Sequence, residues 1–239
     1  MTMFYTEIAK YYDYIFPTGK MQLQFITESA GQPPKDILDV ACGSGGYSKS
    51  LSDAGYSITA IDLDEKMVQS LKEKDDKINA QVLNMLNISE LHQTFDLIFC
   101  IGNSIVHLNG LEEIETFIKS CKNNLKDNGT LILQIVNYDR ILAKDIRELP
   151  TIKNEEKNLI FERYYSYLEE QHRVNFKTIL TVDDKVLEND VILFPIKSTE
   201  IKEILEDAGF ANIEFYGSFK KDKYEPLESF PLVIVSQNK

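Results

Sequence analysis

The sequence has no tryptophan, and it has only three cysteines and three histidines in 239 residues. Residues that hold a metal ion or form a disulfide framework recur at short, paired spacings. Cys42, Cys100 and Cys121 show no such spacing, and the histidines are equally scattered. We therefore expect no metal site and no disulfide framework, and unpaired cysteines favour the reducing cytoplasm.

Basic residues are also scarce. The chain carries 26 Lys and Arg against 38 Asp and Glu, which gives a formal net charge of -12. Proteins that bind nucleic acid usually present a dense basic face, so nucleic acid is a disfavoured partner. No apolar run approaches the roughly 18 residues of a membrane span, and the N-terminus lacks the pattern of a signal peptide. The expectation is a cytoplasmic protein without a membrane partner, either a monomer or a homodimer.

Short apolar runs rich in β-branched residues alternate with amphipathic segments. The runs 37–41, 57–61, 80–83, 95–101 and 130–136 read as strands, and 47–54, 65–74 and 111–125 read as helices. This alternation predicts a mainly parallel sheet with helices on both faces. Asp64 is a predicted N-cap, and Asp127-Asn128-Gly129 predicts a helix end with Gly129 in the left-handed conformation.

The pattern changes after about residue 139. Segments 159–168, 173–182 and 186–194 are rich in strand formers with little helix between them, which is typical of antiparallel hairpins. A helix at 200–208 and strands at 210–216 and 232–235 follow. We expect one α/β domain over 1–239, with a helical lid at about 1–30 and a β-rich insertion at about 150–196.

The stretch "DVACGSGG" (39–46) is a glycine-rich turn between a predicted strand and a predicted helix. A dinucleotide fingerprint requires a third glycine where Ser48 stands, and a Walker loop requires a terminal Gly-Lys-Ser/Thr that is absent. The Asp39 carboxylate before the glycines would repel a phosphate. The turn therefore predicts a site for an uncharged or cationic ligand.

Polar residues also follow the next two predicted strands. Asp62 ends the second strand, where a carboxylate can accept hydrogen bonds from both hydroxyls of a ribose. Asn84 and Met85 follow the third strand, and an amide and a thioether suit the edge and the face of an adenine ring. The pattern favours an adenosine-containing ligand.

The motifs "DVACGSG", "AIDLDEKMV", "LNMLNI" and "FDLIFCIGNS" resemble, in order and spacing, those of class I S-adenosylmethionine-dependent methyltransferases. The resemblance covers about residues 37–136. It implies a Rossmann-like three-layer α/β/α fold whose seven-stranded, mostly parallel sheet has an antiparallel last strand. It also implies S-adenosyl-L-methionine as cofactor and S-adenosyl-L-homocysteine as product. The implied cofactor-binding residues are Tyr11, Asp39, Ala41, Gly43, Gly45, Asp62, Leu63, Asn84, Met85, Ile101 and His107.

A narrower resemblance lies in "CIGNSIVHL" and "ILQIVNYDRIL", which are similar to stretches of the glycine N-methyltransferases. It implies His107 and Asn103 as catalytic residues, and Tyr14, Asn103, Tyr138 and Arg163 as substrate-binding residues. Those enzymes carry an arginine just before Asn-Tyr-Asp that holds the substrate carboxylate, and Val136 occupies that position here. Either Arg140 or Arg163 could supply the missing cation.

The predicted reaction is methyl transfer to a small molecule, with an amine nitrogen as the first choice. The amine must react unprotonated, and because desolvation lowers the pKa of an amine, a closed site could suffice without a strong base. His107 is the candidate base if one is needed. The alternatives are O-methylation of a small metabolite, a nucleotide-dependent oxidoreductase, and a cofactor-binding protein without turnover.

Overall fold

The computed structural model describes residues 8, 11–183 and 185–239, and a seven-stranded sheet forms its centre. The strand order is β10-β11-β5-β4-β1-β2-β3. The strands are β1 (Asp36–Val40), β2 (Ser57–Asp62), β3 (Asn79–Val82), β4 (Phe95–Cys100), β5 (Leu125–Val136), β10 (Phe210–Tyr216) and β11 (Pro231–Asn238). The pairs β1–β2, β1–β4, β2–β3 and β4–β5 are parallel, and β11 is antiparallel to both neighbours. The expected mostly parallel sheet with an antiparallel last strand is confirmed.

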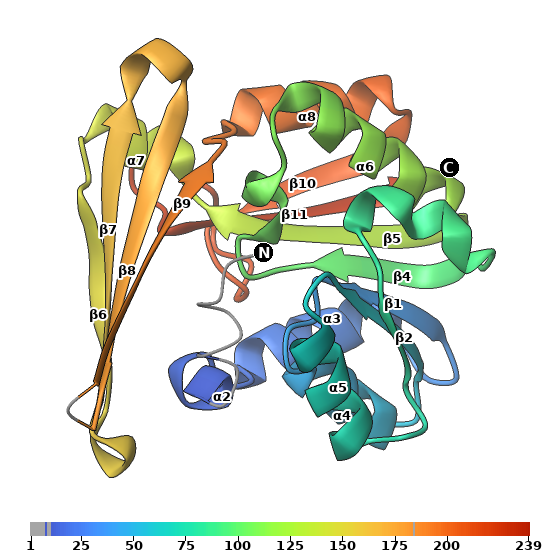
Figure 1. The fold of residues 1–239 in the computed structure, drawn as a ribbon. Coiled ribbons are helices and arrows are strands. Elements are labelled where there is room, and N and C mark those ends of the chain that lie inside the picture. The colour runs from blue at the N-terminus through green and yellow to red at the C-terminus, as the bar shows by residue number, and fades with distance from the viewer. Residues whose placement is uncertain (1–7, 9–10, 184) are drawn as a thin grey trace.

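Helices cover both faces of this sheet (Figure 1). On one face lie α3 (Lys20–Ala30), α4 (Gly46–Asp53) and α5 (Glu65–Lys74), and on the other lie α6 (Leu111–Asn123) and α8 (Ser198–Asp207). Successive strand residues enter opposite cores: Leu38 and Val40 pack toward α6 and α8, and Ile37 packs toward α3, α4 and α5. This period of two is why the strands read as continuous apolar runs. The three-layer α/β/α fold is confirmed.

A second, four-stranded antiparallel sheet interrupts the chain between β5 and β10, and we call it the insertion sheet. It contains β6 (Glu148–Asn154), β7 (Leu159–Leu168), β8 (Arg173–Val182) and β9 (Lys185–Leu193) in that order. The short α7 (Tyr138–Ala143) connects it to β5. The insertion sheet stands across the ends toward which β4 and β5 point (Figure 1). The predicted antiparallel insertion is confirmed, and it faces the edge where parallel sheets bind ligands.

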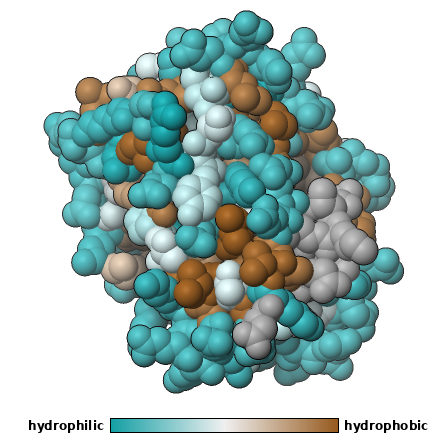
Figure 2. Space-filling view, turned by 60° about the vertical axis from the view of Figure 1, so that its left-hand side comes forward, coloured by the Kyte–Doolittle hydropathy of each residue, from teal (hydrophilic) through white to brown (hydrophobic). Residues whose placement is uncertain are grey.

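The outward face of the insertion sheet is only partly polar. Ile160, Val186 and Ile192 are exposed there, and Figure 2 shows apolar residues gathered in patches within a mostly hydrophilic surface on this side. The opposite face is buried, because Leu159, Phe161, Leu180 and Val182 form a hydrophobic cluster with Ile8 and Ile15. Among the residues that the structure describes, no helix is both long and apolar enough to cross a membrane.

Two local expectations differ from the structure. The helix expected at 111–125 ends at Asn123, and Leu125 already belongs to β5. Asn128, not Gly129, adopts the left-handed conformation, with φ 61°. The prediction was wrong because asparagine also tolerates this conformation, and the turn-forming residues serve an irregularity in the β4–β5 pairing rather than a helix end. The predicted Asp64 cap is confirmed: its carboxylate accepts from the backbone N–H groups of Lys66 and Met67 at 2.9 and 3.2 Å.

The N-terminal region contains α2 (Tyr12–Ile15) and α3. Residues 1–7 and 9–10 of the helical lid expected at about 1–30 lie outside the described residues. The single-domain boundary and the lid function of this region stay predictions.

Candidate active site

Asp39 is a buried carboxylate near the end of β1. Its side chain is on the same face of the sheet as Ile37, toward α4, and the residue is 3% exposed. The Ser48 hydroxyl of α4 donates to it at 2.6 Å. Burial raises the Asp39 pKa from 3.8 to about 7, the Ser48 hydrogen bond opposes this rise, and the nearby Asp62 charge adds to it. Ser48 therefore stands where a dinucleotide fingerprint has its third glycine, and its hydroxyl donates a hydrogen bond to Asp39.

Asp62, at the end of β2, holds the neighbouring loops in place. Its carboxylate accepts from the backbone N–H of Gly43 at 2.8 Å and from that of Asp64 at 2.9 Å. Burial raises its pKa, and the two backbone N–H donors oppose the rise. Each carboxylate oxygen has a second lone pair, so the same group can still accept hydrogen bonds from two adjacent hydroxyls of a ligand.

The turn 39–46 bends sharply between these two carboxylates. Ala41, Gly43 and Gly45 have φ angles of 59°, 55° and 79°. A side chain on Gly45 would collide with Leu71 of α5, and one on Gly43 would come within 3.0 Å of the Tyr12 ring. The glycines are thus required both by the backbone conformation and by the close approach of two helices.

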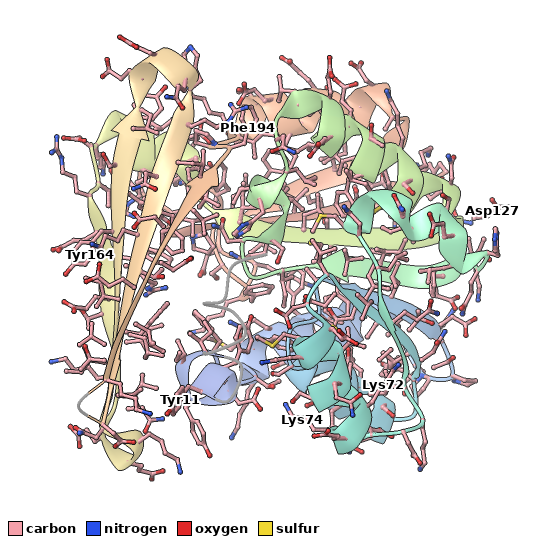
Figure 3. All side chains as sticks on the ribbon, viewed as in Figure 1. Tyr11, Lys72, Lys74, Asp127, Tyr164 and Phe194 are labelled. Atoms are coloured by element: carbon pink, nitrogen blue, oxygen red, sulfur yellow. The ribbon has the colours of Figure 1, made fainter. Side chains whose placement is uncertain are left out.

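The segment around α2 closes over this turn. Asp13 accepts hydrogen bonds from the Ser44 hydroxyl and from Lys74 Nζ, the latter at 2.6 Å, and Lys74 also donates to the Ser44 carbonyl at 2.9 Å. Tyr12 lies against Gly43. Both Tyr12 and the predicted Tyr11, which lies beside α2 (Figure 3), pack against the hydrophobic cluster of the insertion sheet. The sequence analysis missed Tyr12, Asp13 and Lys74, because no local pattern connects positions 61 residues apart.

The predicted adenine-binding residues lie beyond Asp62. Leu63 is 54% exposed, which is unusual for a leucine next to a buried carboxylate. The side-chain oxygen of Asn84 accepts from Leu86 N–H at 2.9 Å and caps the 3₁₀ helix Met85–Leu91. Its amide NH₂ has no hydrogen bond with any described residue, so it can still donate to a ligand. Met85 is partly buried against the core.

Asn103 connects the ends of β4 and β5. It is left-handed, with φ 69°, and its side-chain oxygen accepts from Val136 N–H at 2.9 Å. Its amide NH₂ donates to the Tyr138 hydroxyl at 3.2 Å. Ile101, two residues earlier, is partly buried against the core on the α3, α4 and α5 side of the sheet. The structure thus brings Ile101, Asn103 and Tyr138 together at the carboxyl edge of the sheet, but Asn103 already has two protein partners.

His107 ends the 3₁₀ helix Ser104–His107 after β4. The residue is exposed, yet enough protein surrounds the imidazole to lower its pKa from 6.5. It forms no hydrogen bond with the part of the chain that the structure describes. A neutral imidazole of this kind can accept a proton, but no second group orients it.

The last two predicted substrate residues both lie at the insertion sheet. Tyr14 is 40% exposed, and Lys157 Nζ lies 4.6 Å from its ring centroid, beside the insertion sheet. Arg163 is a half-buried residue of β7, and its Nη2 donates to the Pro150 carbonyl at 2.6 Å. Tyr14 is therefore not gathered with Asp39 and Asn103, and Arg163 belongs to the inner face of the insertion sheet.

The donor set fits S-adenosylmethionine. Asp39 is buried and Asp62 partly buried, neither carboxylate forms an ion pair with a described residue, and a ligand with ammonium and sulfonium charges would compensate them. The turn between them offers no phosphate-binding lysine. Within 8, 11–183 and 185–239, no three His, Cys, Asp or Glu side chains gather so that they could hold a metal ion.

Comparisons with known proteins agree with this geometry. Residues 37–129 match the family model described as a methyltransferase domain. The chain is similar to glycine/sarcosine N-methyltransferase of Aphanothece halophytica, with 24% identity over 209 residues that cover 85% of this chain and 77% of that protein. It is 32% identical to glycine N-methyltransferase of Rattus norvegicus over 123 residues, which are 45% of this chain and 42% of that protein.

The fold likeness extends over the whole chain. The crystal structure of an S-adenosylmethionine-dependent methyltransferase from Clostridium acetobutylicum aligns with a TM-score of 0.81 at 19% identity, and 98% of each chain is covered. The family match contains the turn 39–46, Asp62, Asn84 and Asn103. Residues 37–129 therefore match a methyltransferase domain, the fold is similar to that of an S-adenosylmethionine-dependent methyltransferase, and the chain resembles the glycine N-methyltransferases.

Proposed function

We propose that this protein transfers a methyl group from S-adenosylmethionine to the nitrogen of a small amine. The observation that carries the proposal is the pair of carboxylates, the buried Asp39 and the partly buried Asp62, on either side of a turn that itself contains no lysine or arginine. Two of the relatives it resembles are named as N-methyltransferases of glycine or sarcosine. Together they favour a sulfonium cofactor and an amine acceptor.

Each group of residues has a distinct part in binding. Asp39 faces the positive charge of the methionine portion, and Asp62 accepts from the ribose hydroxyls. Leu63, Asn84 and Met85 provide an apolar surface and an amide donor for the adenine. When bound, the cofactor supplies a methyl carbon that is already activated by a sulfonium.

The chain's contribution to the reaction is mainly orientation and exclusion of water. The insertion sheet and the segment around α2 flank the carboxyl edge of the sheet from two sides (Figure 1). Holding a nucleophile in line in this way can be worth about 7–11 kcal/mol of the barrier. A desolvated site also favours the neutral amine. His107 follows β4, and partial desolvation of its imidazole lowers its pKa; it is the residue proposed to accept a proton if a base is needed.

Asp62→Ala tests the cofactor assignment. We expect S-adenosylhomocysteine to bind about 10- to 100-fold more weakly, because hydrogen bonds to a charged group are lost. Isothermal titration calorimetry measures this directly. Asp64→Ser is the matched control: it keeps an N-cap oxygen for α5 and should retain wild-type affinity.

The acceptor class needs a product assay. Incubation with S-adenosylmethionine and a panel of primary and secondary amines should give methylated amine and S-adenosylhomocysteine, detected by mass spectrometry. Tight binding of NADH with no response to S-adenosylhomocysteine would refute the proposal. O-methylation of a small metabolite is the alternative, and the same assay with alcohols detects it. The cytoplasmic location and the oligomeric state stay predictions.

A further inference from the structure

A row of polar residues crosses the inner face of the insertion sheet. Arg163 of β7 pairs with Thr178 of β8, which pairs with Asn189 of β9. Tyr164 points away from the parallel sheet (Figure 3), so its neighbours Arg163 and Tyr165 project to the opposite side, toward the candidate active site.

Apolar rows flank this polar row on both sides. On one side Phe161 pairs with Leu180, and on the other Tyr165 pairs with Phe176. The first pair belongs to the cluster formed with Ile8 and Ile15. The second pair packs with the core that contains Tyr138. The arginine therefore lies in a polar strip between two hydrophobic clusters.

Two buried polar atoms of this strip have no hydrogen-bond partner among the described residues. They are Arg163 Nε and Thr178 Oγ1, whereas the bordering Tyr165 hydroxyl interacts with that of Tyr138. With the described part of the chain the guanidinium makes a single hydrogen bond, to the Pro150 carbonyl. Leaving such donors unsatisfied is costly, and a buried cation without a counter-charge is costlier still. Groups left in this state in a native fold call for a ligand that satisfies them.

No acidic side chain of the described residues forms an ion pair with Arg163. The Tyr165 hydroxyl is an electrostatic neighbour of its guanidinium. Burial lowers the pKa of the guanidinium and raises that of the Tyr165 hydroxyl to about 12. The other candidate, Arg140, stacks on Phe230 at 5.9 Å and faces a different part of the chain.

The strip is connected to the methyl-acceptor end of the site by aromatic side chains. The Tyr165 ring centroid lies 6.3 Å from that of Tyr138, and the Tyr138 hydroxyl accepts from Asn103. Arg163 is two residues from Tyr165 on the same face of β7, a step of about 7 Å along a strand. It is thus adjacent to the region where β4 and β5 end.

We propose that Arg163, with Thr178 and Tyr165, forms an oxyanion-binding subsite that holds the carboxylate of an amino-carboxylate methyl acceptor. Arg163 Nε–H is unpaired, and Nη2, on the same edge of the guanidinium, has a second N–H besides the one that it donates to Pro150; such an edge matches a carboxylate in a two-point hydrogen-bonded pair. The insertion sheet thereby supplies the cation that Val136 cannot supply from the end of β5. This inference rests on the proposed N-methylation of a small amine and assigns the determinant of its acceptor specificity.

The test uses the full-length protein saturated with S-adenosylhomocysteine. Glycine, β-alanine and 4-aminobutanoate serve as amino-carboxylate probes of increasing length, and propylamine serves as the uncharged-tail probe. Thermal unfolding reports binding. We expect at least one amino carboxylate to raise the Tm of wild type and of Arg147→Met, a matched control whose side chain is 77% exposed. The shift should vanish in Arg163→Met.

Turnover separates this subsite from the amine chemistry. For the amino carboxylate that binds, Arg163→Met should lower kcat/KM about 10- to 100-fold, whereas kcat/KM for propylamine should change less than about twofold. Arg163→Lys keeps the charge and a donor for the Pro150 carbonyl but loses the two-point guanidinium edge, so its kcat/KM for the amino carboxylate should lie between those of wild type and Arg163→Met. Unliganded Arg163→Met should unfold at the wild-type Tm or above it, because removal of an unpaired buried cation is not destabilising.

Each result is decisive. If the amino carboxylates bind equally well to wild type and Arg163→Met, or to neither, the subsite is overturned, even when propylamine is methylated and the proposed function stands. If an amino carboxylate binds through Arg163 but no amine is methylated, the subsite stands and the proposed N-methylation fails. A fall in the Tm of both unliganded Arg163 variants would assign the residue a structural role instead.

Discussion

The stability of Asp39→Asn relative to wild type should increase as the pH rises. The buried carboxylate has its pKa raised from 3.8 to about 7. The folded state therefore binds a proton more tightly than the unfolded state, and stability contributed by this group is lost as the pH rises from about 4 through 7. Asparagine carries no charge, and its oxygen can still accept the hydrogen bond from Ser48.

The size of the effect follows from linkage. With a pKa of 3.8 unfolded and about 7 folded, Asp39 lowers the free energy of unfolding by about 1.7 kcal/mol at pH 5 and about 4.3 kcal/mol at pH 8. The buried amide of Asp39→Asn has its own cost, about 1–3 kcal/mol, but that cost is independent of pH. The stability of the variant relative to wild type should therefore increase by about 2.6 kcal/mol between the two pH values.

Urea unfolding of both proteins at pH 5 and pH 8 measures this difference. A difference that is the same at both pH values, within about 0.5 kcal/mol, would show that Asp39 titrates near its ordinary value and would refute the electrostatic account. Ser48→Ala provides a second test: removing the hydroxyl donor should raise the Asp39 pKa further, so the loss of stability should extend to higher pH. Asp39→Asn should also bind S-adenosylhomocysteine more weakly, although it is the more stable protein at pH 8.

Two further predictions concern the loop after β4. Asn103→Ala should lower the free energy of unfolding, measured in urea, by about 2–3 kcal/mol, because Val136 N–H and the Tyr138 hydroxyl each lose a partner. Asn103→Gly should recover about 1 kcal/mol of this loss, because residue 103 has a left-handed φ of 69°, which glycine adopts without strain and alanine does not. Equal stability of the two variants would contradict this account of the backbone strain. The His107 imidazole should titrate below pH 6.5 by NMR, because desolvation disfavours the imidazolium. The free energy of unfolding should then fall as the pH drops below about 6.5, and this fall should be absent in His107→Gln. A titration midpoint above 6.5 would show that the imidazole is not desolvated in this way.

Much of the cofactor side could be predicted because it depends on short-range sequence. The strand ending in Asp39, the glycines that follow it and the Asp62 position each lie within one strand–turn–helix unit, so spacing alone brings them to the same edge. The same local reasoning failed at Asp127-Asn128-Gly129, where a turn pattern serves an irregular strand pairing rather than a helix end. It also favoured Tyr11 over Tyr12, because a helix of four residues has no periodic pattern that shows which side faces Gly43.

The sequence by itself determined the layer order, the antiparallel insertion and a turn suited to a cation rather than a phosphate, because hydrophobic periodicity and the residues at strand ends are local properties. Only the tertiary structure decided which distant residues meet. The Asp13–Lys74 ion pair joins positions 61 residues apart, and the Arg163–Thr178–Asn189 row depends on the register of three strands. Burial is likewise a property of the whole fold, and burial is what raises the Asp39 pKa and lowers the pKa of the Arg163 guanidinium.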